Sequence, residues 1–169
     1  MGPVYTAAVA TLRLRPMTDA EFAAFRARAI HDYAAEKISA EGCTRERAEA
    51  LAEEETDALL PDGKVTEGMF IVMADAEDVG PVGYAWLALR GPDTSAAWIY
   101  DIAIDEEQRG KGYGRALMNG LEQVAREHGL EAIALSVSAG NDYARRLYER
   151  AGFKPTSIRM AKRFDDELD

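Results

Sequence analysis

The sequence of 169 residues has few of the side chains that build disulfide frameworks and metal sites. It contains 1 cysteine, Cys43, and 2 histidines, so an internal disulfide is excluded and no Cys/His cluster indicates zinc. It has no apolar run long enough for a membrane span and no pattern typical of a signal segment. We therefore expect a cytoplasmic protein that binds neither a metal nor a membrane.

Basic residues are also in deficit. Lys and Arg number 20 against 30 Asp and Glu, which gives a net charge of −10 at pH 7. Nucleic acid is not an expected partner, because phosphate binding needs a basic face, whereas an acidic surface attracts cationic substrates. Apolar residues make up 47% of the chain, enough for a core. We predict one domain over residues 1–169, with residues 1–10 as an irregular extension.

Residues 97–117 join a strand pattern to a glycine-rich turn that opens an amphipathic helix. The strand is almost entirely apolar, which is typical of a strand covered on both faces. The turn, residues 109–114, reads RGKGYG and places bare backbone where the helix must begin. Backbone N–H groups at a helix N-terminus bind anions, and the helix dipole adds to the attraction. We predict a site for a phosphate-bearing ligand at this turn.

Two well-known phosphate-binding motifs do not fit the turn. A P-loop requires Ser or Thr after its lysine, and Lys111 is followed by Gly112. The dinucleotide fingerprint requires a glycine three residues after its second glycine, and that position is Arg115. A strand-to-helix turn without any ligand remains the alternative.

The pattern Arg109-x-x-Gly112-x-Gly114 resembles the acyl-CoA pyrophosphate loop of the GCN5-related N-acetyltransferases, the GNAT family. A second stretch, residues 139–153 (AGNDYARRLYERAGF), is similar to another motif of that family, in which Asn141 ends a strand and Tyr148 lies on a short helix. Residues 12–16 also resemble the family's first strand. The resemblance is weak over residues 11–93 and strong over 98–153.

The expected elements give an α/β fold with a mixed sheet and helices on both faces, in the GNAT-like order strand, two helices, three strands, helix, strand, helix, strand. The strands are predicted at 11–15, 69–74, 82–89, 97–104, 132–138 and about 157–164, and the helices after Thr18, at 45–60, at 115–128 and after Asn141. The first helix carries Phe22, Phe25, Ala29 and Tyr33 on one face. Family members often have a longer hairpin at the C-terminal end, where this sequence has room for only one strand. The shorter end puts one wall of the acceptor pocket in doubt, and a second subunit, as in a homodimer, is one way to supply that wall.

The resemblance implies an N-acetyltransferase that uses acetyl-CoA as cosubstrate, needs no metal, and acetylates a primary amine by direct attack in a ternary complex. The acceptor is either a small-molecule amine or a protein amine. The implied acetyl-CoA-binding residues lie in the central strand, in the turn and before the last helix: Ile102, Ala103, Ile104, Arg109, Gly110, Lys111, Gly112, Tyr113, Gly114, Arg115 and Asn141. Two alternatives stay open, a non-catalytic acyl-CoA sensor and a nucleotide-binding interaction module.

Tyr148 is the candidate general acid. Phenols and thiols have ordinary pKa values of roughly 10 and 8.5, so a positioned tyrosine is able to protonate a departing thiolate. A tyrosine that only packs beside Leu147 is the alternative. Asn141 suits a helix cap, and the resemblance adds a hydrogen bond to the pantetheine arm of CoA.

Asp101 is the candidate on the acceptor side. We expect Ile99 and Ala103 on its face of the strand, where a carboxylate is costly unless it is paired or used. Some polyamine-acetylating members of the family have an acid at this position, which implies that Asp101 holds or deprotonates an ammonium group. The alternative is a structural salt bridge or a hydrogen bond to a helix end. Trp98 and Tyr100 are expected on the opposite face.

Overall fold

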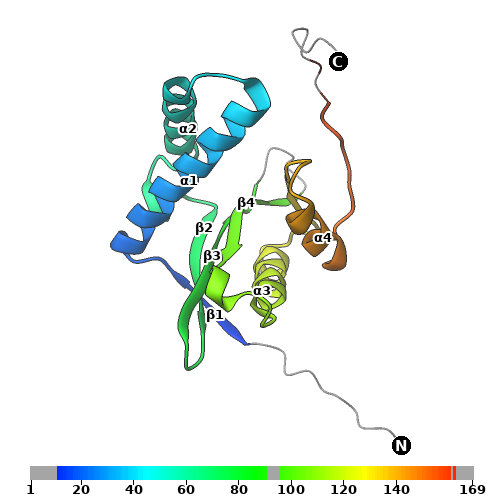
Figure 1. Ribbon diagram of the computed structural model, residues 1–169. Coiled ribbons are helices and arrows are strands. Elements are labelled where there is room, and N and C mark those ends of the chain that lie inside the picture. The colour runs from blue at the N-terminus through cyan, green and yellow to red at the C-terminus, as the bar shows by residue number, and fades with distance from the viewer. Residues whose placement is uncertain (1–10, 91–95, 161, 163–169) are drawn as a thin grey trace, which may run out of the picture. The chain divides into compact units, whose positions relative to one another are not determined.

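The computed structural model describes residues 11–90, 96–160 and 162 (Figure 1). Its packing divides the chain into two units, one up to Ser136 and one from Val137. The predicted extension over residues 1–10 lies outside the described residues, and the single domain over 1–169 stays a prediction.

The order of the described elements follows the predicted order up to the last helix. The first unit contains β1 (Leu12–Pro16), α1 (Asp19–Glu41), α2 (Arg45–Leu59), η1 (Gly63–Val65), β2 (Met69–Ala76), β3 (Gly80–Ala88), β4 (Ala97–Ile104), η2 (Glu106–Gln108), α3 (Tyr113–Glu127) and β5 (Ile133–Leu135). The second unit contains α4 (Asp142–Arg150). The strand predicted over 132–138 is thus shorter than expected.

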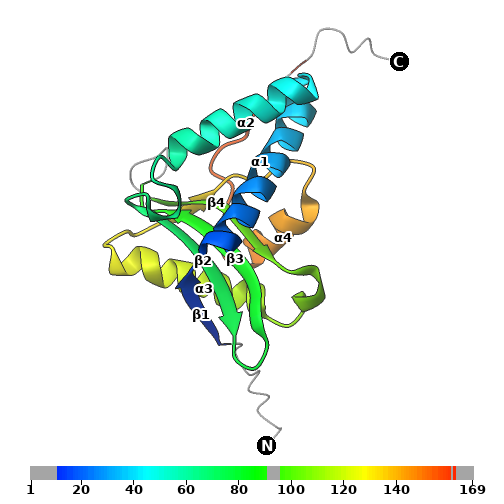
Figure 2. The same ribbon diagram turned by 90° about the vertical axis from the view of Figure 1, so that its left-hand side faces the viewer.

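The first unit is built on a five-stranded sheet in the order β1-β2-β3-β4-β5. The first three pairings are antiparallel, and β4 pairs with β5 in parallel, which requires a crossover that α3 supplies. In Figures 1 and 2, α1 crosses one face of the sheet and α3 lies on the other. The predicted mixed α/β sheet is confirmed.

The core on the α1 face explains how the first helix is placed. It consists of Met17, Phe25, Leu60, Ile71, Tyr84 and Trp86, and Phe22 and Ala29 pack against it. These helix residues confirm the predicted apolar face, but Tyr33 is 38% exposed and its hydroxyl donates to Glu55 of α2. The reason is that the later turns of α1 pack on α2 through small residues such as Ala34 and Ala52 instead of on the sheet.

The closing strand predicted over 157–164 is wrong for residues 157–160 and 162, which form no strand. Ile158 is 81% exposed and Met160 is 88% exposed. A strand needs a neighbour that takes up its backbone hydrogen bonds, and none of the described strands pairs with these residues. Residues 161, 163 and 164 lie outside the described residues.

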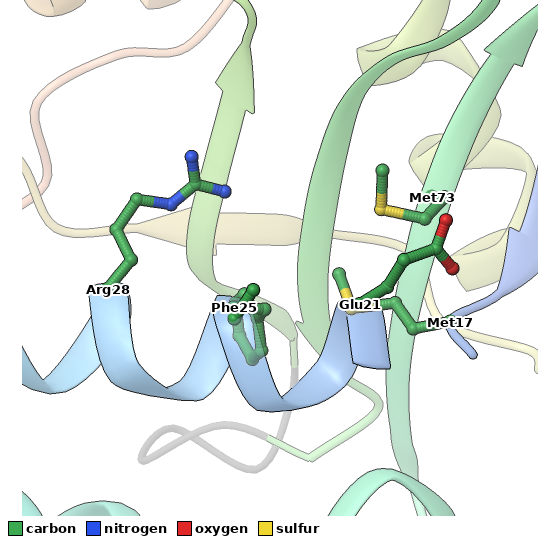
Figure 3. Close-up of a pocket in the computed structure, with 6 residues that line it drawn as sticks. Met17, Glu21, Phe25, Arg28 and Met73 are labelled. Carbon is green, nitrogen blue, oxygen red and sulfur yellow. The ribbon is translucent and has the colours of Figure 1, made fainter. Parts of the chain in front are cut away.

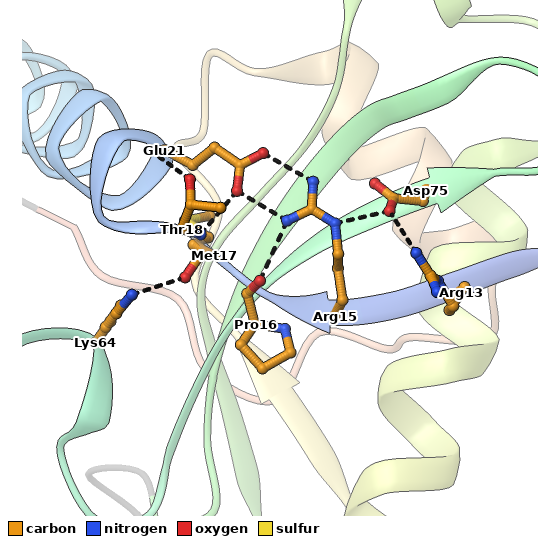
Figure 4. Close-up of polar contacts among 8 residues, drawn as sticks. All are labelled: Arg13, Arg15, Pro16, Met17, Thr18, Glu21, Lys64 and Asp75. Atoms are coloured by element: carbon orange, nitrogen blue, oxygen red, sulfur yellow. Dashed lines mark hydrogen bonds and ion pairs between the residues drawn. The ribbon is translucent and has the colours of Figure 1, made fainter.

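The start of α1 is fixed to the sheet by a network of charges (Figure 4). Thr18 and Glu21 form the predicted capping box. The guanidinium of Arg15 donates to both carboxylate oxygens of Glu21, each at 2.8 Å, and to Asp75 Oδ2 at 2.7 Å. Arg15 therefore ties the first turn of the helix to strand β2.

This network predicts a loss of stability in acid. The hydrogen bond from Arg15, followed by that from the Thr18 backbone, lowers the pKa of Glu21 from 4.5 to about 2. Because the folded pKa is depressed, the interaction stabilises the fold above pH 4.5 and is lost as the pH falls toward 2. We expect the melting temperature to fall less over this window in Glu21→Gln than in the wild type. Thermal denaturation at several pH values measures the difference.

Glu46→Gln is the matched control, because Glu46 also lies in the first turn of a helix, α2. It should keep the full pH dependence of the wild type. A Glu21→Gln protein with the same pH dependence as the wild type would contradict the role given to the Arg15–Glu21 pair.

Candidate active site

The glycine-rich turn has the backbone that its sequence predicts. Gly110 and Gly112 have φ values of 75° and 87°, which only glycine adopts without strain. Gly112 is the N-cap of α3 and supplies no side-chain cap. The first amide bonded back to the turn is that of Ala116, which donates to Gly112 O at 3.1 Å. The amides of the preceding helical residues, 113–115, are therefore those that a helix N-terminus offers to an anion.

Cationic side chains surround this N-terminus. Arg109, Lys111 and Arg115 are all exposed. Arg109 Nε donates to Ile104 O at 3.1 Å, and Lys111 Nζ donates to Gln108 Oε1 at 2.9 Å. The bond from Arg109 links the turn directly to the last residue of β4.

Strand β4 has a partly unpaired edge. Its parallel partner β5 pairs only with Ala97, Trp98 and Ile99. At the other end, Asp105 N donates to Val82 O at 2.9 Å, so the alternation of an antiparallel ladder turns the backbone groups of Ile102 and Ile104 away from β3. The second half of β4 thus presents backbone donors and acceptors along an edge that no described strand covers.

A register shift in β4 changes which side chains share a face. Trp86 is opposite Asp101, but its neighbour Leu87 is opposite Ile99, so Tyr100 is the extra residue of a bulge. The Tyr100 ring lies 4.7 Å from the Trp86 ring on the α1 face, and the Trp98 ring follows at 6.5 Å from that of Tyr100.

The expected faces of β4 are corrected accordingly. Asp101 reaches the same face, because it accepts a hydrogen bond from Tyr84, a member of the α1-face core, at 3.0 Å. The expectation that Trp98 and Tyr100 face away from Asp101 is therefore wrong. Ile99 is the residue that faces away, and the bulge is the reason.

The surroundings of Asp101 oppose its ionisation. Burial raises the pKa of Asp101, the hydrogen bond from Tyr84 lowers it, and the charge of Asp32 raises it further. The pKa of Glu36 is raised by burial and then by Asp101 and Asp32. Because Asp32 and Glu36 belong to α1, the helix and β4 together gather negative charge on this side of the sheet.

An open pocket of about 250 Å³ lies between α1 and β2 on the same face. It is lined by Met17, Glu21, Ala24, Phe25, Arg28 and Met73, and all of these except Ala24 are labelled in Figure 3. The guanidinium carbon of Arg28 stands 4.3 Å from the centre of the Tyr84 ring, so the pocket borders the pair formed by Tyr84 and Asp101. The sequence alone predicts no role for Arg28 or Tyr84. Tyr84 is recognised as the partner of Asp101 only from the register of β3 on β4.

The second unit holds the other predicted site residues. Asn141 is the N-cap of α4, and its Oδ1 accepts a hydrogen bond from Ala144 N at 3.1 Å, which confirms the expected cap. Tyr148 is half-buried, its ring lies 5.7 Å from that of Phe153, and its carbonyl accepts from Phe153 N at 3.0 Å. Both side chains are thus anchored within this unit.

No group of three His, Cys, Asp or Glu side chains in the described residues is arranged to hold a metal ion. Over the same parts of the chain, no helix combines the length and the apolar character needed to cross a membrane.

A model of the acetyltransferase (GNAT) family matches residues 28–153, which include the turn, β4 and α4. The chain belongs to this family. As a GNAT-family acyltransferase it is 34% identical over 154 residues to the uncharacterized N-acetyltransferase YycN of Bacillus subtilis (strain 168), a match that covers 90% of this chain and 99% of YycN.

The crystal structure of YycN has the same fold as this GNAT protein. It superposes with a TM-score of 0.82 at 33% identity and covers 91% of this chain and 99% of YycN. The mycothiol acetyltransferase of Beutenbergia cavernae is 32% identical over 119 residues, a match that covers 66% of this chain and 39% of that enzyme. The family predicted from the glycine turn and the α4 motif is thus confirmed.

Close contact of β3 with β4 generates a testable prediction. A Cβ at Gly83 would lie 2.3 Å from Ala103 O and 2.9 Å from Ile104 Cδ1, so Gly83→Ala must push the two strands apart. We expect the free energy of unfolding to fall by about 1–3 kcal/mol, measured by urea denaturation. Gly140→Ala is the control, because a Cβ there meets no heavy atom within 4 Å. Equal unfolding midpoints for the two variants would contradict the close approach.

Proposed function

We propose that the protein transfers the acetyl group of acetyl-CoA to a primary amine by direct attack of the amine in a ternary complex. The observation that carries the proposal is the uncapped N-terminus of α3 beside the unpaired edge of β4, joined by the bond from Arg109 to Ile104. Family membership supports acyl transfer. The structure of AAC(6′)-Iy, which shares the fold with a TM-score of 0.57 at 19% identity, contains a bisubstrate analog with a CoA portion and supports the choice of donor.

The residues of the turn fit the pyrophosphate of CoA. The left-handed backbone at Gly110 and Gly112 would be strained with any residue that has a Cβ, and bare amides suit phosphate oxygens. The positive charges of Arg109, Lys111 and Arg115 add attraction for these oxygens. Tyr113 and Gly114 contribute first-turn amides of α3.

The edge of β4 fits the amide-bearing pantetheine arm. The backbone groups of Ile102 and Ile104 point away from β3. Ile104 O accepts from Arg109 and the Ile102 N–H bonds to Asp101, so the carbonyl of Ile102 and the amide of Ile104 are the groups proposed to bond amides of an extended ligand, much as a neighbouring strand would. Ala103 lies between them and packs toward the α1-face core. Asn141 uses Oδ1 for its cap, which leaves its NH₂ group for the proposed bond to pantetheine. Acetyl-CoA supplies the thioester-bound acetyl group.

Asp101 is proposed to receive the proton of the acceptor ammonium. An ammonium has no lone pair with which to attack a thioester, so the reaction requires a base at the acceptor. The acid lies on β4 one residue before the proposed pantetheine contacts, and Asp32 and Glu36 add negative charge near it. This arrangement favours a cationic acceptor.

Tyr148 is proposed to protonate the departing thiolate. Its ring is packed on Phe153 within the second unit, which restrains the direction of the phenol. A positioned phenol is a suitable acid because its pKa lies near that of the thiol it serves. Asn141 on the same unit begins the helix that carries it.

A small-molecule amine is the favoured acceptor, supported by the mycothiol acetyltransferases among the relatives. Mass spectrometry of a panel of primary amines incubated with protein and acetyl-CoA is the direct test. Acetylated amines are the expected result. Acetyl-CoA binding without any acetylated amine would favour an acyl-CoA sensor. A larger thermal shift with ATP or NAD than with CoA would favour a nucleotide-binding module.

Acetyl-CoA should stabilise the fold, and Gly112→Asp should abolish this effect. At about a hundred times its dissociation constant a ligand adds roughly 2.7 kcal/mol to the free energy of unfolding. The new carboxylate would strain the backbone at φ 87° and repel phosphate. Gly129→Asp is the matched control, because Gly129 has a φ of 76° but follows the opposite end of α3. If a folded Gly112→Asp protein keeps the full shift in melting temperature, the phosphate site lies elsewhere.

Tyr148→Phe tests the proposed acid. The change removes one hydroxyl and keeps the ring on Phe153, so stability and CoA affinity should stay near wild type. The turnover number should fall by roughly 10²- to 10⁴-fold, and less with an acyl donor whose leaving group has a much lower pKa. Tyr143→Phe is the control on the same helix, where Tyr143 is 64% exposed. Wild-type turnover in Tyr148→Phe would assign the proton to another donor.

A further inference from the structure

Tyr84 occupies an unusual place for a tyrosine. It lies in the middle of β3 with only 4% of its surface exposed, inside the α1-face core. The Phe25 ring meets its ring edge-on at a centroid distance of 5.4 Å, and Arg28 covers the ring at 4.3 Å. These contacts restrain the ring, and its hydroxyl donates to Asp101 Oδ2 at 3.0 Å.

This hydrogen bond restricts the Asp101 side chain, which could otherwise rotate about its terminal torsion. The terminal torsion of an aspartate has a broad minimum, so packing around Cβ alone does not fix the plane of the carboxylate. The bond from Tyr84 holds Oδ2 of Asp101, and with the hydrogen bond from the Ile102 backbone it restricts the plane of the carboxylate. The ring contacts of Tyr84 would be the same for a phenylalanine, and only the hydroxyl acts on Asp101.

The charges that face Asp101 come from two elements besides its own. From α1, Asp32 raises the pKa of Asp101 and Arg28 lowers it. Glu36 on the same helix is close enough for Asp101 to raise its pKa. From β3, Tyr84 lowers the pKa of Asp101 through its hydrogen bond, second in size only to the upward effect of burial. Tyr84 thus makes the largest of the contributions that favour the charged form of this carboxyl, followed by the hydrogen bond from the Ile102 backbone.

We infer that Tyr84 is a positioning residue for Asp101, whose carboxylate it holds in the orientation that accepts a proton from the acceptor ammonium. The inference rests on the proposed function and names a further residue of its acceptor side. In the step it serves, one proton moves from the ammonium to the Asp101 carboxylate and leaves a neutral amine. The nitrogen lone pair then forms the C–N bond as the C–S bond breaks, and the sulfur leaves as a thiolate. The nitrogen is positively charged after the attack and gives its second proton to water, while the thiolate takes up a proton from the proposed acid.

Tyr84→Phe, with Tyr33→Phe as matched control, tests the inference in kinetics. The control loses the same kind of bond, from a tyrosine hydroxyl to a carboxylate, at Glu55 on α2. The probe is the best acceptor among pentylamine, 1,5-diaminopentane and 5-aminopentanoate. In Tyr84→Phe we expect kcat/KM for the amine to fall roughly 10- to 100-fold, the range for a lost bond to a charged group. The acidic limb of its pH profile should move to higher pH, because the bond that lowers the pKa of Asp101 is gone.

Tyr33→Phe should leave both kcat/KM for the amine and the acidic limb of the pH profile unchanged, even if its melting temperature falls as far as that of Tyr84→Phe. A double-mutant cycle with Asp101→Asn adds a second criterion. If Tyr84 acts through Asp101, its loss should have little further effect on kcat/KM once Asp101 is an amide. Fully additive effects, or a Tyr84→Phe protein with the wild-type pH profile, would overturn the inference.

A measurement without turnover keeps the inference separate from the proposed function. Carboxyl ¹³C NMR of aspartate-labelled protein, with the Asp101 signal assigned by its loss in Asp101→Asn, gives the pKa directly. The pKa of Asp101 should be higher in Tyr84→Phe and unchanged in Tyr33→Phe. An unchanged value in Tyr84→Phe would overturn the inference whether or not any amine is acetylated. If the shift is present but wild-type protein acetylates no amine, the proposed function alone fails.

Discussion

Incomplete pairing of β4 is the constraint on which the rest of the first unit depends. The strand is paired with β3 along most of its length, but β5 accompanies it only from Ala97 to Ile99. A buried backbone group without a hydrogen bond costs about 1–3 kcal/mol, so an open strand edge has to meet water or a ligand. The crossover through α3 starts at this edge and brings a helix N-terminus to it. A strand edge and an anion site thereby adjoin, which is the arrangement that a long, phosphate-ended ligand requires.

Charge is distributed to suit two different ligands. The chain as a whole has a net charge of −10, yet the turn before α3 carries Arg109 and Lys111, and the first turn of α3 carries Arg115. On the α1 face of the sheet the balance is reversed, and burial together with Asp32 opposes ionisation of Asp101. Separate parts of the same strand are therefore suited to the polyanionic donor and the cationic acceptor that we propose. This separation supports direct transfer between two bound substrates.

Local features of the site were predictable from sequence because they depend on a few adjacent residues. The positive φ values at Gly110 and Gly112, the capping box at Thr18 and the cap at Asn141 follow from residue types within one turn of backbone. Features that depend on distant partners were predicted less well. The pattern places Tyr33 on the same helix face as Phe22 and Phe25, although its end of α1 packs on α2. It also predicts a strand over 157–164, although residues 157–160 pair with none of the described strands.

The sequence by itself determined the family, the order of the elements up to α4, and the turn that opens α3. Tertiary structure alone decided which side chains surround Asp101. A period of two residues predicts strand faces only while the register is unbroken, and the bulge at Tyr100 shifts that register by one residue. Tyr84, 17 residues away in sequence, becomes the partner of Asp101 because β3 pairs with β4 in this one register. Pairing between strands is a long-range interaction, so no local pattern in the sequence records it.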